Sequence, residues 1–402
     1  MIPSIASRIP LVRRAKKPAL PLDERIALLT RLAVEPAGAS HRDLVARACG
    51  VLNYAALIAS DVGMPDLAAH LSWRQHRVFA EAGNLSGDIA VMSLMPLINI
   101  SRLLTREGDG EAAYDVLTRL YRAAQKRSTA EIRGHTVDLS KLIDNEADHR
   151  KICQELWVTM LVDGARALAR ISRWTEAAEA MTAHRGVGNR LLDGRQIQIM
   201  SLMERGLDEQ ARATIDSTAT KEPWENTVAA FLRIYCRPAA DPMPEAELEL
   251  ALQGALALIT SPDPEVTAFQ ARVGLTALEL VPDHTSPHAA RLRDALAVVA
   301  SHDAYAAREV LEHHATRPHL TPDQRYSLDV LLTASGLGTG NLPQAHLDAL
   351  SEAVDKAEAA LRERLNGREG TAGVTPSVTP STRSPGSASS SRGAACTSRR
   401  TM

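Results

Sequence analysis

A recurring spacing between a turn residue and a small residue constrains this chain more than any other feature. Glycine is followed five residues later by alanine at Gly63–Ala68, Gly108–Ala113 and Gly206–Ala211, and serine replaces the glycine at Ser172–Ala177. Glycine at a helix end readily adopts a left-handed backbone, and a small residue one turn into the next helix lets two helices approach closely. Hairpins that repeat in this way stack into a solenoid, so the spacing predicts an all-α chain of antiparallel helix pairs.

Composition also favours helices over sheets. Of the 402 residues, 45% are hydrophobic but only 3% are aromatic. Ala and Leu lose little freedom in a helix, whereas a β-sandwich needs β-branched and aromatic residues in alternation. The 46 Lys and Arg and the 48 Asp and Glu leave a formal net charge of −2. A global polyanion-binding surface is therefore not expected, and any basic patch has to be local.

Cysteine usage and the first residues bear on the cellular compartment. Cys49, Cys153, Cys236 and Cys396 lie far apart with no paired spacing, which is typical of reduced thiols. The basic residues near the start are interrupted by prolines, without the apolar stretch of a signal peptide. No run of the sequence approaches the length that we expect of a segment that spans a bilayer. We therefore expect a cytoplasmic protein with no membrane contact.

The sequence divides into four parts. Residues 1–21 are basic, punctuated by proline and predicted to be poorly ordered, and residues 22–224 are predicted to form helical repeats. Residues 225–366 continue with more irregular helices, since several prolines break the pattern. Residues 367–402 are rich in Gly, Ser, Thr and Pro, and this composition predicts a disordered tail.

Four units within residues 48–224 resemble the tetratricopeptide-repeat family. That motif combines small residues in both helices, a turn glycine and a closing proline. The last unit has Gly206, Ala211 and Pro223, although Ile199 stands where a small residue is usual. The step from Ser172 to Gly206 is 34 residues, the repeat length of this family. The resemblance implies a TPR-like α-solenoid that binds a peptide or protein.

The same region is similar to the helical-repeat regions of actinobacterial transcriptional regulators. Many of those regulators carry an N-terminal helix-turn-helix domain. Here too few residues precede Leu52 for such a domain. The resemblance therefore does not imply direct sequence-specific DNA binding.

In a TPR-like array the first helix of each hairpin lines a concave groove. The inward positions would be Asn53, Asn99, Arg102, Arg106, Asp163, Arg166, Arg170 and Gln196. Guanidinium groups bind oxyanions bidentately, so this groove would suit an acidic peptide, a C-terminal carboxylate or a phosphorylated ligand. The alternative is that these arginines are solvated or paired with Asp and Glu on neighbouring turns.

A basic, glycine-bearing loop is a second candidate, here for a small anion. Its polar members are His184, Arg185, Arg190, Asp193 and Arg195. Backbone amides next to glycine can approach an oxyanion, but the terminal Gly-Lys-Ser/Thr of a phosphate-binding loop is missing. The alternative is an ordinary connection between repeats.

The sequence lacks the common catalytic signatures, namely a Gly-x-Ser-x-Gly elbow, a kinase set and a dinucleotide fingerprint. His149 with Cys153, and His313 with His314, lack the further ligands of a metal site. We expect no metal and no cofactor.

The sequence therefore favours a non-enzymatic helical-repeat protein, a regulatory or adaptor module whose groove binds a peptide, a protein or a small anionic signal. Self-association through exposed solenoid ends stays open. The alternative is an enzyme or accessory protein of a biosynthetic pathway, with a pocket near residues 184–195. In that case His149, His184 and Asp193 would converge.

Overall fold

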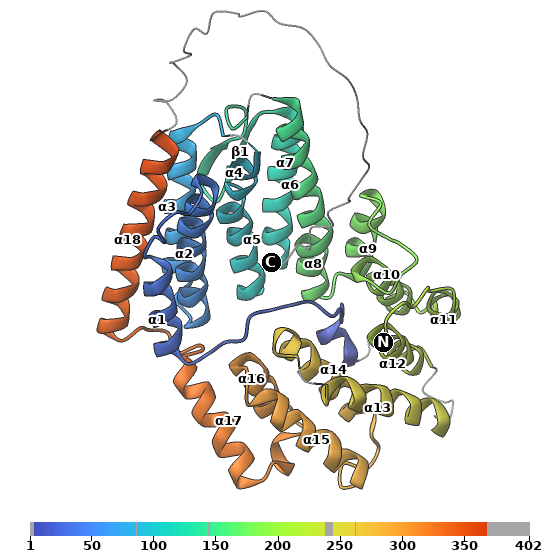
Figure 1. The fold of residues 1–402 in the computed structure, drawn as a ribbon. Helices are drawn as coiled ribbons and strands as arrows, with labels where there is room; N and C mark the ends of the chain where they lie inside the picture. Colours follow the sequence, from blue (N-terminus) through green and yellow to red (C-terminus); the bar gives the residue numbers. More distant parts are fainter. Residues whose placement is uncertain (1–3, 86, 144, 238–243, 262, 368–402) are drawn as a thin grey trace, which may run out of the picture.

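Helices make up almost all of the regular structure, so the fold is all-α as predicted (Figure 1). It was analysed as a computed structural model, which describes residues 4–85, 87–143, 145–237, 244–261 and 263–367. The first half contains α1 (Leu22–Leu32), α2 (His41–Asp61), α3 (Pro65–Ala82), α4 (Gly87–Met92), α5 (Met95–Glu107), α6 (Gly110–Lys126), α7 (Glu146–Thr159) and α8 (Ala165–Arg170). A π-helical turn, Met160–Gly164, joins the last two. The second half contains α9 (Trp174–Ala183), α10 (Asp193–Glu204), α11 (Asp208–Asp216), α12 (Pro223–Tyr235), α13 (Glu245–Ile259), α14 (Thr267–Leu280), α15 (Pro287–Ala300), α16 (Ala304–Glu312), α17 (Pro322–Ser335) and α18 (Gln344–Asn366).

One short hairpin interrupts the helices. Strands β1 (Thr129–Ile132) and β2 (His135–Asp138) pair antiparallel, with Thr129 opposite Asp138. Gly134 turns the chain between them at a φ of 78°. The hairpin packs on α6 and buries Ile132 and Val137.

The four turn positions have the backbone that their spacing predicts. The φ angles are 86° at Gly63, 88° at Gly108, 68° at Gly206 and 60° at Ser172. The small residues five positions later are fully buried; they are Ala68, Ala113, Ala177 and Ala211. Each turn joins two helices that contact one another, α2 with α3, α5 with α6, α8 with α9 and α10 with α11.

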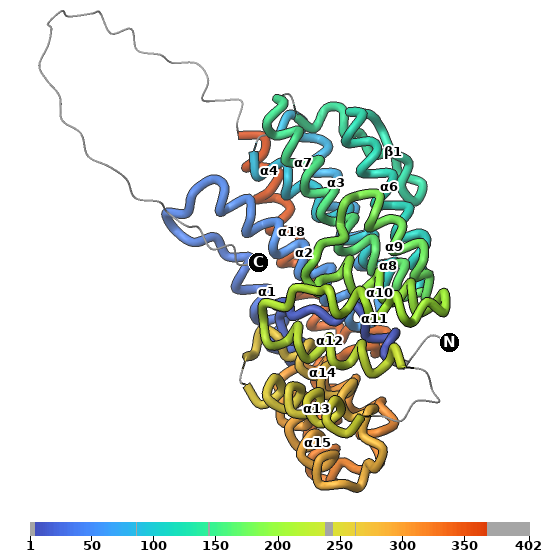
Figure 2. The backbone as a smooth tube through the Cα atoms, turned by 90° about the vertical axis from the view of Figure 1, so that its right-hand side faces the viewer, coloured from blue at the N-terminus to red at the C-terminus, as the bar shows by residue number. Residues whose placement is uncertain are grey.

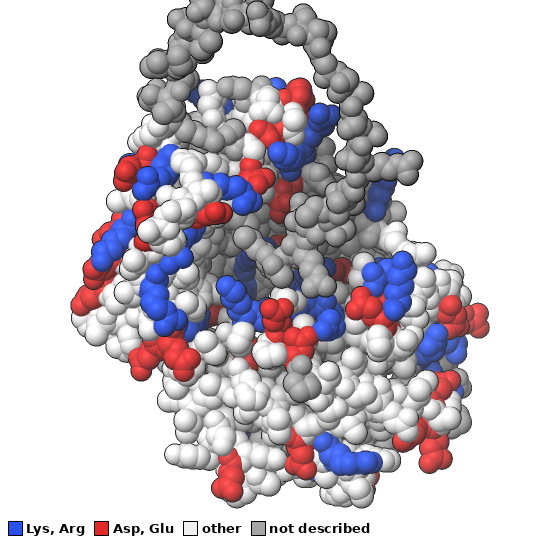
Figure 3. All heavy atoms as spheres, in the orientation of Figure 1, with Lys and Arg blue, Asp and Glu red and all other residues white. Residues whose placement is uncertain are grey.

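The helices return on themselves to form a ring. The C-terminal helix α18 packs against α1, α2 and α3, at the left of Figure 1. In the loop before it, the N–H of Gly338 donates to the carbonyl of Asp61 at 2.9 Å. The hydrophobic core divides in two near α8, because Ala167 belongs to the core of the first half and α18 while Leu168 belongs to that of the second half. The space-filling view shows the molecule hollowed at its centre, with Lys and Arg as well as Asp and Glu around the hollow (Figure 3).

The N-terminal segment crosses this ring. Residues 4–21, hereafter the strap, contain the 3₁₀ helix η1 (Ser4–Arg8) and an extended run that passes from α14 to α1 (Figure 2). Ile5, Ile9 and Leu11 are at most 5% exposed. This corrects the expectation of a poorly ordered segment, because prolines prevent helix but permit an extended chain that buries its apolar side chains. The predicted tail beyond Gly367 lies outside the described residues.

Two helical segments are long and apolar enough to cross a membrane by length and composition, which the sequence analysis did not anticipate. They are His41–Asp61 and Gly87–Glu107, and the share of each apolar window that is buried inside the protein is 50% and 56%. Both contribute side chains to the hydrophobic core, as internal helices of a globular fold do.

Candidate functional site

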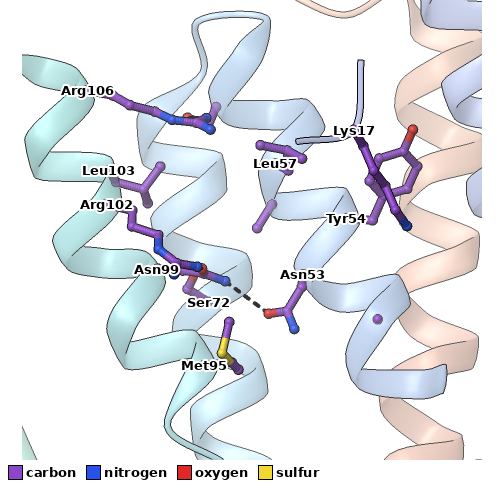
Figure 4. A pocket seen from close by; sticks show the side chains of 13 residues that line it. Lys17, Asn53, Tyr54, Leu57, Ser72, Met95, Asn99, Arg102, Leu103 and Arg106 are labelled. Carbon is purple, nitrogen blue, oxygen red and sulfur yellow. Dashed lines mark hydrogen bonds between the residues drawn. The ribbon is translucent and has the colours of Figure 1, made fainter. Parts of the chain in front are cut away.

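Four of the predicted groove residues gather at one cavity. Asn53 lies on α2, and Asn99, Arg102 and Arg106 lie on one face of α5, because residues three and four apart share a helix face (Figure 4). The cavity has a volume of about 320 Å³, and Lys17 of the strap completes its rim. The remaining lining is mostly apolar or small: Gly50, Tyr54, Ala56, Leu57, Ser60, Ser72, Met95 and Leu103.

The polar groups of this cavity keep unused hydrogen-bond donors. The side chain of Asn99 donates to that of Asn53 at 3.0 Å. Arg102 pairs with Asp163 at 2.9 Å, and Arg106 donates to Ser60 at 2.7 Å. Both arginine side chains remain more than two-fifths exposed, and each guanidinium carries five N–H groups. Lys17 forms no hydrogen bond or ion pair with any residue that the structure describes.

Beside the cavity, a buried carboxylate gathers three donors that the sequence analysis missed. Asp61, at the end of α2, accepts from Arg25 at 2.5 Å, from the Tyr305 hydroxyl at 2.5 Å and from Arg106 at 3.1 Å. The side chains of Asp61 and Arg25 are only 3% and 2% exposed. A buried carboxylate needs such compensation. Nothing in the local sequence marks Asp61, since its partners come from α1, α5 and α16.

Three other predicted groove residues serve internal contacts. Asp163 pairs with Arg102, and Arg166 donates to Asp193 at 2.7 Å. Gln196 is fully buried and bonds to the backbone of Leu11 in the strap. For Asp163 and Arg166, the structure therefore agrees with the alternative that neighbouring charges pair.

Arg170 differs from these three residues. It is exposed and forms no ion pair within the described part of the chain. Although the side chain reaches solvent, desolvation lowers the pKa of Arg170, and the positive charge of Arg272 lowers this pKa further. The negative charge of Glu309 acts in the opposite direction. Arg106 and Arg308 lower the pKa as well, so Arg170 stands among like charges.

The strap and the second half add cations that sequence reasoning did not place. The ammonium of Lys16 lies 3.5 Å from the centre of the Tyr305 ring, a cation–π contact. Although Lys16 keeps contact with solvent, desolvation and the charge of Arg272 lower its pKa to about 8. Arg272 on α14 holds Glu309 bidentately: Nη2 donates to Oε1 at 2.7 Å, and Nε donates to Oε2 at 3.2 Å. The lysines were visible in the sequence, but a segment predicted to lack order could not be assigned to a site.

Three charged side chains of the predicted anion loop make contacts inside the protein. Arg190 pairs with Glu222 and Glu225, and Arg195 donates to Ser217 at 2.7 Å. Asp193 holds Arg166 and also Arg14 of the strap. These contacts are those of a connection between helices, the alternative considered above.

The histidines near this loop have separate partners. His184 meets the Tyr121 ring edge-on at 5.6 Å, and Arg185 has a left-handed φ of 54°. His149 contacts the carbonyl of Ala124 at 2.8 Å. In the described residues no hydrogen bond or ion pair joins His149, His184 and Asp193, so the convergence required by the enzyme alternative is not seen.

One cluster has the donor types of a metal site. The ligand atoms of Glu279, His313 and His314 lie within 4.8 Å of one another. Nδ1 of His313 accepts from the N–H of Ala315, so the proton sits on Nε2, which donates to Glu279 at 2.9 Å. Arg8 donates to the same carboxylate oxygen at 2.7 Å. The contacts of Glu279 are therefore those of an ion-pair network. Glu279 is also the third donor beside His313 and His314 that the sequence analysis did not find.

Comparison with known protein families, with curated proteins and with solved structures finds no match for this chain.

Proposed function

We propose that this chain is a non-enzymatic binding protein of the TPR-like helical-repeat type, which holds an anionic ligand in its central hollow. One observation carries the proposal. The cavity between α2 and α5 combines Lys17, Arg102 and Arg106 with the amides of Asn53 and Asn99. Charged donors of this kind recognise carboxylates and phosphates, and an apolar lining accommodates the rest of a ligand.

The charge around the hollow supports this ligand class. Three cations line the cavity, namely Lys17, Arg102 and Arg106. Four more lie around them: Lys16, Arg170, Arg272 and Arg308. The carboxylates beside them are Asp61, Asp163, Asp303 and Glu309. Because cations outnumber carboxylates, the hollow attracts anions although the whole chain carries a formal charge of −2.

The ligand under this proposal is the acidic part of a peptide or protein, or a small anionic signal. Binding requires complementarity and no bond breaking, which fits an adaptor or regulatory module.

The direct test is binding of a fluorescein-labelled hexaglutamate peptide, followed by fluorescence anisotropy. Arg170→Glu should weaken binding at least about tenfold, since it places a negative charge among the cations of the hollow. Arg166 is a poor choice for this test, because its partner Asp193 anchors the strap.

Arg77→Glu is the matched control, because Arg77 is an exposed residue of α3 that neither lines the cavity nor belongs to the cations around Arg106 and Arg170. Its affinity should stay near that of the wild type. Equal affinities for Arg170→Glu and Arg77→Glu, or no binding of the acidic peptide to the wild type, would refute the proposal.

A further inference from the structure

The strap is an extended segment whose backbone forms hydrogen bonds with the elements that it crosses. A buried side chain binds the backbone of the strap: Gln196 accepts from the N–H of Leu11 at 2.7 Å and donates to the carbonyl of Leu11 at 3.0 Å. Further along, the N–H of Lys16 donates to the carbonyl of Glu265 at 2.6 Å. The N–H of Ala19 donates to the side chain of Asp303, and the carbonyl of Ala19 accepts from the N–H of Ala304. Backbone pairing of this kind holds an extended segment.

Carboxylates on separate elements meet the arginines of the strap one by one. Arg8 pairs with Glu279 of α14 at 2.7 Å, and Arg13 pairs with Asp263 at 2.5 Å. Arg14 pairs with Asp193 at the start of α10, whose side chain is only 6% exposed. We call the surface formed by Asp193, Gln196, Asp263, Glu265, Glu279 and Asp303 the inner wall.

Apolar contacts fix the register of the strap on the inner wall. Ile5, Ile9, Leu11 and Val12 belong to the same core cluster as Leu191, Ile197 and Leu275 of the wall elements. The apolar pair Leu11-Val12 thus precedes the arginine pair Arg13-Arg14. The first pair packs in the apolar cluster, and the second pair binds carboxylates of the inner wall. Removal of the strap would uncover this apolar surface and leave Gln196 and Asp193 without these partners. Only a segment with the same groups can replace it.

We propose that the inner wall is a recognition surface for an extended basic segment with two apolar residues followed by two arginines, and that the strap is its resident intramolecular ligand. A partner protein with such a segment displaces the strap. This inference does not rest on the proposed anion site. The inner wall binds the strap through carboxylates and Gln196, whereas the anion site combines Lys17 of the strap with arginines of α5.

The test uses the full chain and a fluorescein-labelled peptide of residues 4–21. The wild type should not bind the peptide at micromolar concentration, because its own strap has a far higher effective concentration. A chain with Leu11→Asp, Arg13→Glu and Arg14→Glu, which leaves the wall intact, should bind the peptide at least about tenfold more tightly than a peptide of scrambled order. Adding Asp193→Lys to that chain should abolish binding.

Two outcomes overturn the inference: the triple variant keeps its helical circular dichroism and does not bind the peptide, or it binds the scrambled peptide equally well. Hydrogen exchange on the wild type gives a second measurement that needs no variant. The amides of Leu11, Lys16 and Ala19 should exchange at least about tenfold faster than those of α14, through local opening. Equal rates would mean that the strap leaves only on global unfolding, and the inference would be wrong.

Discussion

Ser172 occupies a backbone conformation that favours glycine. Its φ of 60° matches the left-handed turns at Gly63, Gly108 and Gly206. A side chain there costs more than glycine does, even after the greater entropy of glycine in the unfolded chain is counted. We predict that Ser172→Gly raises the free energy of unfolding by about 0.5–1 kcal/mol in urea denaturation. Ser172→Ala keeps the Cβ atom and should give no gain, so equal stabilities of the two variants would contradict this reasoning.

Under the proposed function, we predict that Lys16 makes anion binding depend on pH. Desolvation and Arg272 lower its pKa to about 8, with Arg106 acting in the same direction and Asp303 and Asp61 opposing. The ammonium is therefore largely charged at pH 7 and largely neutral at pH 9. The affinity for the hexaglutamate peptide should fall over this interval, measured by anisotropy at constant ionic strength. Lys16→Arg keeps its charge and should remove most of the fall; an unchanged pH profile in that variant would assign the effect to other groups.

Lys16 also makes the stability of the protein depend on pH, and here the effect is a rise with pH, whereas the affinity for the peptide falls. Because the folded pKa lies below the ordinary value of 10.5, folding disfavours the charged form of Lys16. Its contribution to stability should therefore rise between about pH 8 and 10.5.

Helical spacing was enough to place some site residues but not others. Asn53, Asn99, Arg102 and Arg106 were predicted to face inward from the position of the turn glycines, and they line the cavity. Arg272 and Arg308 were not predicted, since prolines obscure the repeat spacing in the second half. Gln196 was placed on the inner face, but its partner Leu11 lies 185 residues away in a segment that the prolines made look disordered.

At the scale of elements, α18 closes the ring. The sequence predicts an amphipathic helix from Gln344 to about Leu365, and the structure contains it. The sequence pattern could not show that the apolar face of this helix packs on α2. Amphipathicity indicates that one face is buried, but it does not identify the element that covers this face. In the structure α18 covers a face of α2 that an open array would leave exposed.

The closure by α18 can be measured with two substitutions on this helix. Leu361 is fully buried, so Leu361→Ala should lower the free energy of unfolding by about 2–5 kcal/mol. Lys356, on the exposed face, pairs with Glu352 four residues away, and Lys356→Ala should cost less than about 0.5 kcal/mol. Urea denaturation followed by circular dichroism compares the two. A small and equal effect would show that α18 is not part of the cooperative fold.

For the whole molecule, the ring depends on contacts that no local pattern encodes. Asp61 joins α1 through Arg25, α5 through Arg106 and α16 through Tyr305, and these residues are spread from position 25 to position 305. The spacing analysis predicts hairpins that contact their sequence neighbours, so an extended array and a closed ring look alike in the sequence. What separates them is a charged network between distant elements, together with the strap across the hollow.

Substitutions at Asp61 and Tyr305 test whether this network holds the ring together. Asp61→Asn removes the charge that compensates the buried Arg25 and should lower the free energy of unfolding by about 3–5 kcal/mol. Tyr305→Phe removes one hydrogen bond and leaves the ion pairs, so about 1–2 kcal/mol is expected. Both values come from urea denaturation followed by tryptophan fluorescence. If charge compensation holds the distant elements together, Asp61→Asn must be the more damaging change; a loss no greater than that of Tyr305→Phe would mean that apolar packing alone closes the ring.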